Sequence, residues 1–169
     1  NDLDSPIVRG LETGAKWGVR LSYIVQAEQR GLAHAIGLTK DFVAGEPFCV
    51  FLGDNIFQEK MSDLLRAFPA SDSEANIALG EVADPTRFGI AEVQDGVIKR
   101  VVEKPKVPPS NLAIAGVYLF RSSIYDSISK IKPSARNEYE ITDAIQHLIE
   151  SGAKVTHYKI TGWWIDAGK

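Results

Sequence analysis

Two short, almost uninterrupted apolar runs constrain the fold of this chain more than any other feature. Residues 47–53 read PFCVFLG and residues 112–120 read LAIAGVYLF. Runs of this length are typical of strands that are covered on both faces, as in the sheets of α/β proteins. We therefore expect two buried strands, and a buried, unreactive thiol at Cys49 in the first of them.

Segments with helical and strand periodicity alternate around these runs. Helices are predicted at residues 31–43, 60–68 and 140–150, and further strands at residues 19–26, 76–82 and 153–160. Residues 89–105 predict a β-hairpin that turns at Asp95-Gly96. Strands that alternate with helices indicate a single α/β domain over residues 1–169, with a Rossmann-like, layered α/β/α fold and a mixed, mostly parallel sheet.

Charge and composition narrow the classes of function. The chain has 19 basic and 22 acidic residues and no basic block, which disfavours nucleic-acid binding. No run approaches the ~20 apolar residues that cross a bilayer. The single cysteine suits a reducing compartment. We therefore expect a cytoplasmic protein that has neither nucleic acid nor a membrane as its partner.

Polar residues follow several predicted strand ends, namely Gln26, Asp54, Glu103 with Lys104, and Asp166. Strand ends of a parallel sheet meet at one rim, so these side chains can share a cleft. Asp54 and Asp166 are suitable ligands for Mg²⁺, and Lys104 is a suitable partner for a phosphate. Asp is also a common turn and cap residue, and Glu-Lys-Pro a common loop entry. These residues alone do not separate a binding site from ordinary turns.

Seven motifs stand in an order similar to that of the sugar-1-phosphate nucleotidyltransferases. They read VQAEQRGLAHAI, FLGDNIF, DPTRFGIAEV, VVEKP, AIAGVYLF, SARNEYEITD and WWIDAG. The set most resembles the glucose-1-phosphate thymidylyltransferases. This resemblance implies the nucleotide-diphospho-sugar transferase fold. It also implies a Mg²⁺-dependent reaction of dTTP or UTP with glucose 1-phosphate, which gives a nucleoside-diphosphate sugar and pyrophosphate.

The resemblance also implies roles for nine residues. It implies metal binding by Asp54 and Asp166, and recognition of a pyrimidine base by Gln26 and Gly31. It implies contacts to the sugar and its phosphate by Gly89, Glu103, Lys104, Tyr118 and Arg136. Asp54, Asp166 and Lys104 would be the catalytic residues.

One part of the family pattern does not occur in these 169 residues. Family members carry a first strand, a GxGTRLxPxT loop that wraps the triphosphate, and a Lys-Pro motif. Losing such charge stabilisation costs orders of magnitude in rate, so we expect residues 1–169 alone to be an inactive fragment. Without that strand, residues 47–53 should expose an apolar edge, which predicts either about 50 further N-terminal residues or a fragment that repacks or forms a homo-oligomer. The alternative is a non-catalytic module that senses sugar phosphates or serves assembly.

Overall fold

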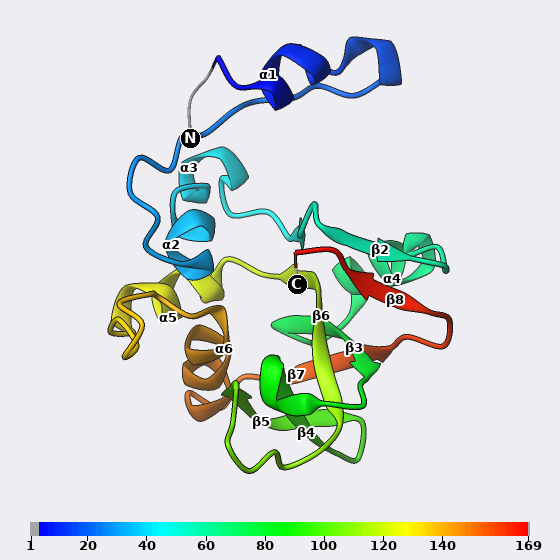
Figure 1. Ribbon diagram of the computed structural model, residues 1–169, viewed down its shortest axis with the longest axis vertical. Helices are drawn as coiled ribbons and strands as arrows, with labels where there is room; N and C mark the ends of the chain where they lie inside the picture. The colour runs from blue at the N-terminus through cyan, green and yellow to red at the C-terminus, as the bar shows by residue number, and fades with distance from the viewer. Residues whose placement is uncertain (1–3, 169) are drawn as a thin grey trace.

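Helices cover both faces of a mixed sheet in the computed structural model, which describes residues 4–168 (Figure 1). The helices are α1 (Pro6–Leu11), α2 (Leu32–Gly37), α3 (Lys40–Val43), α4 (Ser62–Ala67), α5 (Ser123–Lys130) and α6 (Ile141–Glu150). The strands are β1 (Phe48–Phe51), β2 (Asn55–Phe57), β3 (Ala75–Glu81), β4 (Gly89–Gln94), β5 (Val97–Glu103), β6 (Leu112–Phe120), β7 (Val155–Lys159) and β8 (Trp164–Asp166). Six strands form one sheet in the order β1-β6-β3-β7-β5-β4, and β2 and β8 form a separate two-stranded ribbon.

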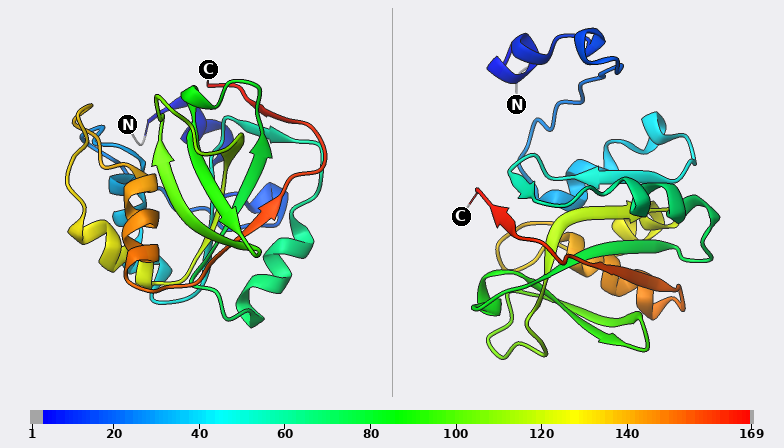
Figure 2. Two further views of the ribbon diagram at one scale, coloured as in Figure 1. Left: turned by 90° about the horizontal axis from the view of Figure 1, so that it is seen from below. Right: turned by 90° about the vertical axis from the view of Figure 1, so that its right-hand side faces the viewer.

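The alternation of side chains along the central strands creates the layers. Ile77 and Leu79 of β3 belong to the larger core, which packs against α2, α5 and α6, whereas Ala78 between them belongs to the smaller core under α4. Tyr118 and Val117 of β6 divide in the same way. Figure 2 shows α5 and α6 on one side of the sheet and α4 on the other. The predicted burial of residues 112–120 on both faces is therefore confirmed.

The α/β class and the mixed sheet are confirmed. The β4–β5 hairpin turns at Asp95 and Gly96, with φ values of 51° and 75° that match the favoured two-residue turn. Among the described strands, β3 and β7 pair in parallel and the other pairs are antiparallel. The parallel share is thus smaller than expected, because the hairpin and β6 run against their neighbours.

Strand β1 differs from its prediction. It lies at the edge of the sheet and, within residues 4–168, pairs only with β6. Cys49 is exposed, and the side chain of Phe51 is 52% exposed. The expectations of a strand covered on both faces and of a buried thiol are therefore wrong. The edge is apolar, as we expected for a sheet that lacks the family's first strand.

Two further segments differ from their predictions. Residues 19–26 join neither sheet, because a strand is defined by pairing with a neighbour and none lies beside them. The helix predicted over residues 31–43 is divided into α2 and α3, where the Thr39 hydroxyl donates to the Ile36 carbonyl at 2.7 Å. Before these segments, α1 lies apart from the sheet as an arm (Figures 1 and 2). None of the helices within residues 4–168 is long and apolar enough to cross a membrane.

Candidate active-site cleft

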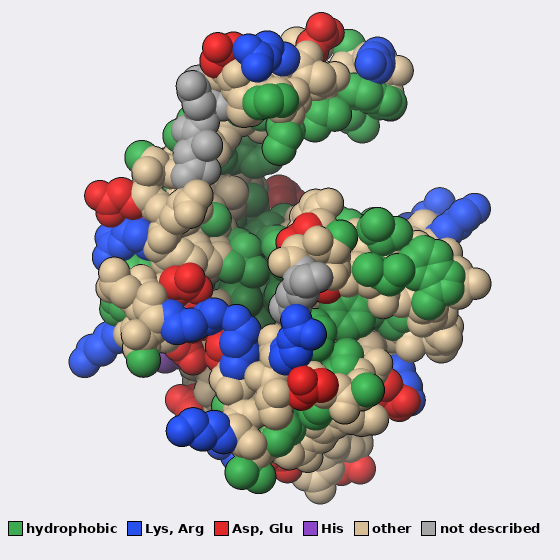
Figure 3. Space-filling view, viewed as in Figure 1, with side chains coloured by type: hydrophobic (Ala, Val, Ile, Leu, Met, Phe, Trp, Pro, Cys, Tyr) green, Lys and Arg blue, Asp and Glu red, His purple; other side chains and the backbone are tan. Residues whose placement is uncertain are grey.

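A cleft of about 610 Å³ lies between the β2–β8 ribbon on one side and the start of β4, the end of β5 and the middle of β6 on the other. Seven of the nine residues predicted from the sequence line it, namely Asp54, Gly89, Glu103, Lys104, Tyr118, Arg136 and Asp166. In the space-filling view, charged side chains gather on the body of the molecule, below the hollow under the N-terminal arm (Figure 3). The structure therefore brings together residues that are distant in the sequence.

The β2–β8 ribbon carries one wall of the cleft. Asn55 stands opposite Asp166 in its antiparallel register, and the Ala167 N–H donates to the Asp54 carbonyl at 2.8 Å. A Cβ atom on Gly168 would lie 2.5 Å from Asp54 Oδ2 and 3.2 Å from Asp166 Oδ1. The two carboxylates thus converge on the space that the missing side chain of Gly168 leaves open. We call Asp54 and Asp166 on this ribbon the acidic wall.

The donor chemistry of the acidic wall fits Mg²⁺. This ion is usually held by one or two carboxylates, with water and substrate phosphates as its other ligands. Residues 4–168 contain no group of three or more His, Cys, Asp or Glu side chains that could hold a metal. A pair of carboxylates without nitrogen or sulfur ligands does not suit a structural zinc site.

Strain in the backbone aims two consecutive residues into the same cleft. Side chains of successive strand residues normally point to opposite faces. Lys104 follows the last residue of β5, directly before Pro105, and has a φ of 41° in the left-handed region, which is costly for a residue with a Cβ. Its Nζ lies 3.7 Å from Glu103 Oε1. The strain therefore places the carboxylate and the ammonium group side by side.

Arg136 is held by three carboxylates. Its Nη2 lies 2.9 Å from Glu140 Oε2, 3.2 Å from Glu103 Oε1 and 3.5 Å from Glu138 Oε2. Burial by itself would lower the pKa of Arg136, but the hydrogen bonds and charge of Glu140 and the charges of the other two carboxylates raise it overall. Glu140 is buried and also accepts a hydrogen bond from the Ser134 hydroxyl at 2.6 Å. Glu103, Lys104 and Arg136 form what we call the mixed-charge wall.

Tyr118 lies between the two walls on β6 and is 4% exposed. Burial, followed by the negative charges of Glu103, Asp166 and Asp54, raises the pKa of its phenol. The phenol therefore stays protonated and can donate a hydrogen bond to a ligand in the cleft.

Gly89 begins β4 where the backbone meets α6. A Cβ atom there would lie 2.7 Å from Thr142 Cγ2 and 3.2 Å from Glu103 Oε2. The Thr142 hydroxyl donates to Glu103 Oε2 at 3.2 Å, so this buried threonine fixes the carboxylate. Gly89 is therefore required by packing, and its predicted contact with a sugar remains a prediction.

Gln26 and Gly31 do not line the cleft, although the adjacent Leu32 does. The Gln26 amide donates to the Gly31 carbonyl at 3.1 Å and lies 2.9 Å from His34 Nδ1. Gly31 has a φ of 96°, and a Cβ there would lie 2.6 Å from the Tyr139 carbonyl oxygen. Both residues thus belong to one tight turn, and their recognition of a base remains a prediction.

Sequence reasoning missed several residues that shape the cleft, namely Asn55, Glu138, Glu140 and Thr142. Asn55 directly follows Asp54, and the other three lie within one stretch of the SARNEYEITD motif. Their position beside predicted site residues was the available signal. Some of their contacts are local, such as that of Glu140 with Arg136. The contacts of Asn55 with Trp164 and of Thr142 with Glu103 join distant positions, which the sequence could not reveal.

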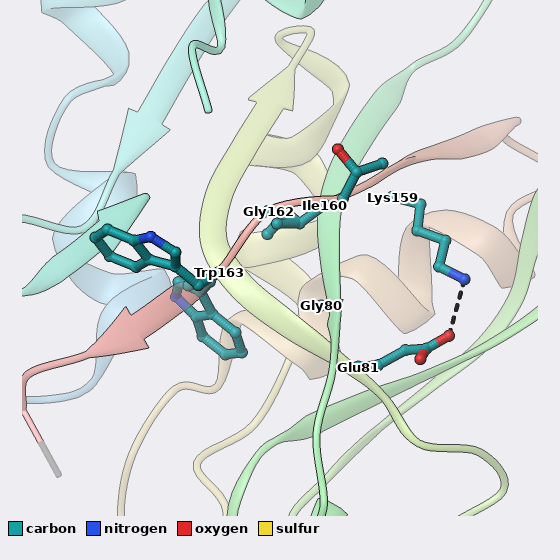
Figure 4. A pocket seen from close by; sticks show the side chains of 8 residues that line it. Gly80, Glu81, Lys159, Ile160, Gly162 and Trp163 are labelled. Carbon is teal, nitrogen blue, oxygen red and sulfur yellow. Dashed lines mark hydrogen bonds and ion pairs between the residues drawn. The ribbon is translucent and has the colours of Figure 1, made fainter. Parts of the chain in front are cut away.

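A second pocket of about 510 Å³ lies at the ends of β3 and β7 (Figure 4). Gly80 lines it, and the Lys159 ammonium group pairs with Glu81 Oε1 at 2.8 Å. Trp164 also lines this pocket, while its indole Nε1 donates to Asn55 Oδ1 at 2.7 Å on the side of the cleft. This tryptophan therefore connects the second pocket with the acidic wall.

Comparisons with known proteins agree with this architecture. A family model described as nucleotidyl transferase matches residues 4–169. The chain is 48% identical over 160 residues to the low-salt glycan biosynthesis nucleotidyltransferase Agl11 of Haloferax volcanii, covering 94% of this chain and 45% of that protein. It is 40% identical over 168 residues to a glucose-1-phosphate thymidylyltransferase of Streptomyces griseus, covering 99% of this chain and 47% of that protein. The chain thus spans about half the length of the curated relatives it matches.

A solved structure shares the fold. It is a crystal structure, in complex with sucrose, of a Bacillus anthracis protein assigned as a glucose-1-phosphate thymidylyltransferase. It superposes with a TM-score of 0.87 at 40% sequence identity, over 96% of this chain and 66% of that chain.

Proposed function

Since the chain belongs to the nucleotidyl transferase family, we propose that it forms the sugar-phosphate-binding and metal-binding part of a single cytoplasmic nucleotidyltransferase domain. The proposed reaction joins dTTP or UTP to glucose 1-phosphate and releases pyrophosphate. The observation that carries this proposal is the convergence of the acidic wall and the mixed-charge wall on one cleft. The proposed binding partners of the protein are the nucleoside triphosphate and glucose 1-phosphate.

The mixed-charge wall would bind the sugar phosphate. Lys104 and Arg136 supply two cations for the phosphate, and Glu103 and Tyr118 supply an acceptor and a donor for sugar hydroxyls. Holding the phosphate in place lets one of its oxygens attack the α-phosphorus of the triphosphate in line. The new phosphorus–oxygen bond forms as the bond to the β-phosphate oxygen breaks, and pyrophosphate leaves with that electron pair.

The acidic wall would hold Mg²⁺ through Asp54 and Asp166, whose carboxylates face the space beside Gly168. When bound, this ion offsets the negative charge that develops on the phosphate oxygens. Backbone hydrogen bonds of the ribbon hold these two residues beside each other, so the positions of their backbones are set before the substrates bind. The turn of Gln26 and Gly31 would recognise the edge of a thymine or uracil base.

Calorimetric titration with glucose 1-phosphate tests the binding part of this proposal. Lys104→Met should weaken binding about tenfold or more, because a charge-assisted hydrogen bond contributes about 1.5–3 kcal/mol. Lys106→Met is the matched control, since Lys106 is an exposed lysine two residues away that does not line the cleft. Equal binding by both variants would contradict the phosphate role of Lys104.

The catalytic part requires this chain joined to a segment that binds the triphosphate. Such a polypeptide should release pyrophosphate from dTTP or UTP in the presence of glucose 1-phosphate and Mg²⁺, and Asp54→Asn or Asp166→Asn should abolish the release. A normal rate in Asp54→Asn would refute the metal assignment. Binding of the sugar phosphate without any transfer would favour the alternative, a sensing module.

A further inference from the structure

We propose that Asn55 is a positioning residue, which together with Trp164 fixes the carboxylate of Asp54 in the orientation that metal binding requires. The three side chains form a chain of two hydrogen bonds across the β2–β8 ribbon. This inference rests on the proposed function, because it concerns a carboxylate that we propose to be a metal ligand.

The chemistry of the partners fixes the orientation of the Asn55 amide. The side chain is buried, and its Oδ1 lies 2.7 Å from Trp164 Nε1. An indole N–H can only donate, so the amide oxygen must face it. The amide nitrogen then faces the other way and donates to Asp54 Oδ1 at 2.7 Å. A flipped amide would lose both hydrogen bonds.

Packing holds each end of this chain of hydrogen bonds. Gly116 has a φ of 71° on β6, and a Cβ there would lie 2.8 Å from Asn55 Cγ. The Asn55 side chain therefore occupies the space that a side chain at position 116 would need. Trp164 packs on Gly80, where a Cβ would lie 2.8 Å from its ring (Figure 4 labels Gly80). Its ring also contacts that of Phe88, with centroids 5.6 Å apart.

These contacts divide the two oxygens of Asp54 between different tasks. Oδ1 accepts the hydrogen bond from Asn55. Oδ2 faces the point beside Gly168 that Asp166 Oδ1 also faces. Fixing Oδ1 therefore sets the direction of Oδ2 before any ion arrives, as hydrogen-bonding partners behind metal ligands commonly do.

The main test is Asn55→Asp, with binding of Mn²⁺ followed by electron paramagnetic resonance as a probe for the Mg²⁺ site. This variant keeps the shape of the side chain and an acceptor for Trp164, but it turns an oxygen instead of an N–H toward Asp54. If Asn55 positions Asp54, Mn²⁺ should bind about tenfold more weakly, in line with the usual effect of such partners. If Asn55 is a bystander, its added negative charge should leave binding unchanged or make it tighter.

A matched control separates orientation from charge. Asn111→Asp adds the same charge at an exposed residue that does not line the cleft. We expect it to bind Mn²⁺ as the wild-type chain does.

Trp164→Phe tests the hydrogen bond from Trp164 to Asn55. It also serves as the main test if Asn55→Asp does not fold. It removes the indole N–H but keeps an aromatic ring between Gly80 and Phe88. Binding of Mn²⁺ should weaken, by less than in Asn55→Asp, because the amide then loses only one of its two partners. In ¹H–¹⁵N spectra, the indole signal missing from this variant belongs to Trp164. That signal should shift when Mg²⁺ is added to the wild-type chain.

The outcomes distinguish this inference from the function on which it rests. A wild-type chain that binds no Mn²⁺ would refute the metal assignment itself. A wild-type chain that binds Mn²⁺, with folded Asn55→Asp or Trp164→Phe binding it equally well, would refute the positioning role alone. Thermal unfolding followed by circular dichroism establishes which variants are folded.

Discussion

The two walls of the cleft hold their charged groups by different means. Asp166 ends β8 and Asp54 directly precedes β2, so backbone hydrogen bonds of the ribbon set the separation of their backbones. Glu103, Lys104 and Arg136 are held by ion pairs and by one strained residue. Backbone pairing is insensitive to salt and to side-chain truncation, whereas partly exposed ion pairs are screened. The acidic wall should therefore be sensitive to side chains that fill its space, and the stability of the mixed-charge wall should depend on individual ion pairs.

The largest effect is expected for Glu140→Ala, because Glu140 holds Arg136 of the mixed-charge wall. This change removes the buried acceptor of Arg136 and Ser134, and we expect the free energy of unfolding to fall by about 1–3 kcal/mol. Glu138→Ala removes a partly exposed partner of the same arginine at 3.5 Å, and it should cost less than about 1 kcal/mol. Urea denaturation of both variants measures the difference. Equal losses would show that burial does not determine the strength of this wall.

Filling the space beside Gly168 should weaken metal binding by the acidic wall. Gly168→Ala places a methyl group 2.5 Å from Asp54 Oδ2, and we expect Mn²⁺ affinity to fall at least about tenfold, which corresponds to about 1.4 kcal/mol. Gly53→Ala is the matched control, because its Cβ would meet nothing within 4 Å. Neither glycine has a left-handed backbone, so strain does not confound the pair. Tight binding by Gly168→Ala would mean that the carboxylates do not use this space.

The strain at Lys104 should be measurable as a difference between two truncations. Lys104→Gly and Lys104→Ala both remove the ammonium group, but only glycine adopts a φ of 41° without cost. We expect Lys104→Gly to be more stable than Lys104→Ala by about 1 kcal/mol, and both to lose affinity for glucose 1-phosphate. Thermal denaturation and calorimetry measure the two properties. A more stable alanine variant would argue against strain at this position.

The smallest effect concerns Asp143, which lines a pocket next to the mixed-charge wall. Burial, followed by the charge of Glu140, raises the pKa of its carboxyl. The folded chain then binds the Asp143 proton more tightly than the unfolded chain does. The protonated carboxyl therefore stabilises the fold relative to the ionised one, and this contribution to the free energy of unfolding is lost as the pH rises through the folded-state pKa. Asp143→Asn should therefore raise the melting temperature at neutral pH, and the gain should disappear below the ordinary Asp pKa of about 3.9. A gain independent of pH would exclude ionisation as its cause.

The two apolar runs show what sequence patterns can and cannot predict about this fold. Residues 112–120 form a strand buried on both faces, as predicted, but the similar run at residues 47–53 forms an exposed edge. Both runs favour a strand locally. Their burial depends on which strands lie beside them, and that is a property of the whole sheet.

The same limit applies to the cleft. Asp54, Glu103, Lys104 and Asp166 line one cleft, as predicted from their places after predicted strand ends. The convergence of parallel strands is not the reason, because β5 is antiparallel to its neighbours and Asp166 lies on the separate β2–β8 ribbon. The contact between Asn55 and residue 164 joins positions that are 109 residues apart, so no local pattern could predict it. Sequence reasoning therefore finds the groups that face a ligand more readily than the groups that hold them in place.

The turn around Gly31 has a consequence for how substrate preference can change. The Arg30 carbonyl accepts a hydrogen bond from the Tyr139 N–H at 2.8 Å, and the Tyr139 carbonyl accepts one from the Ala33 N–H at 3.0 Å. The proposed base-recognition turn is thus fastened to the loop that carries Arg136. Under the proposed function, base selectivity and sugar selectivity would therefore depend on each other. An insertion or a segment exchange in the Gly31 turn would shift the loop that carries Arg136, because backbone hydrogen bonds join the two. A redesign of substrate preference should therefore replace both segments together.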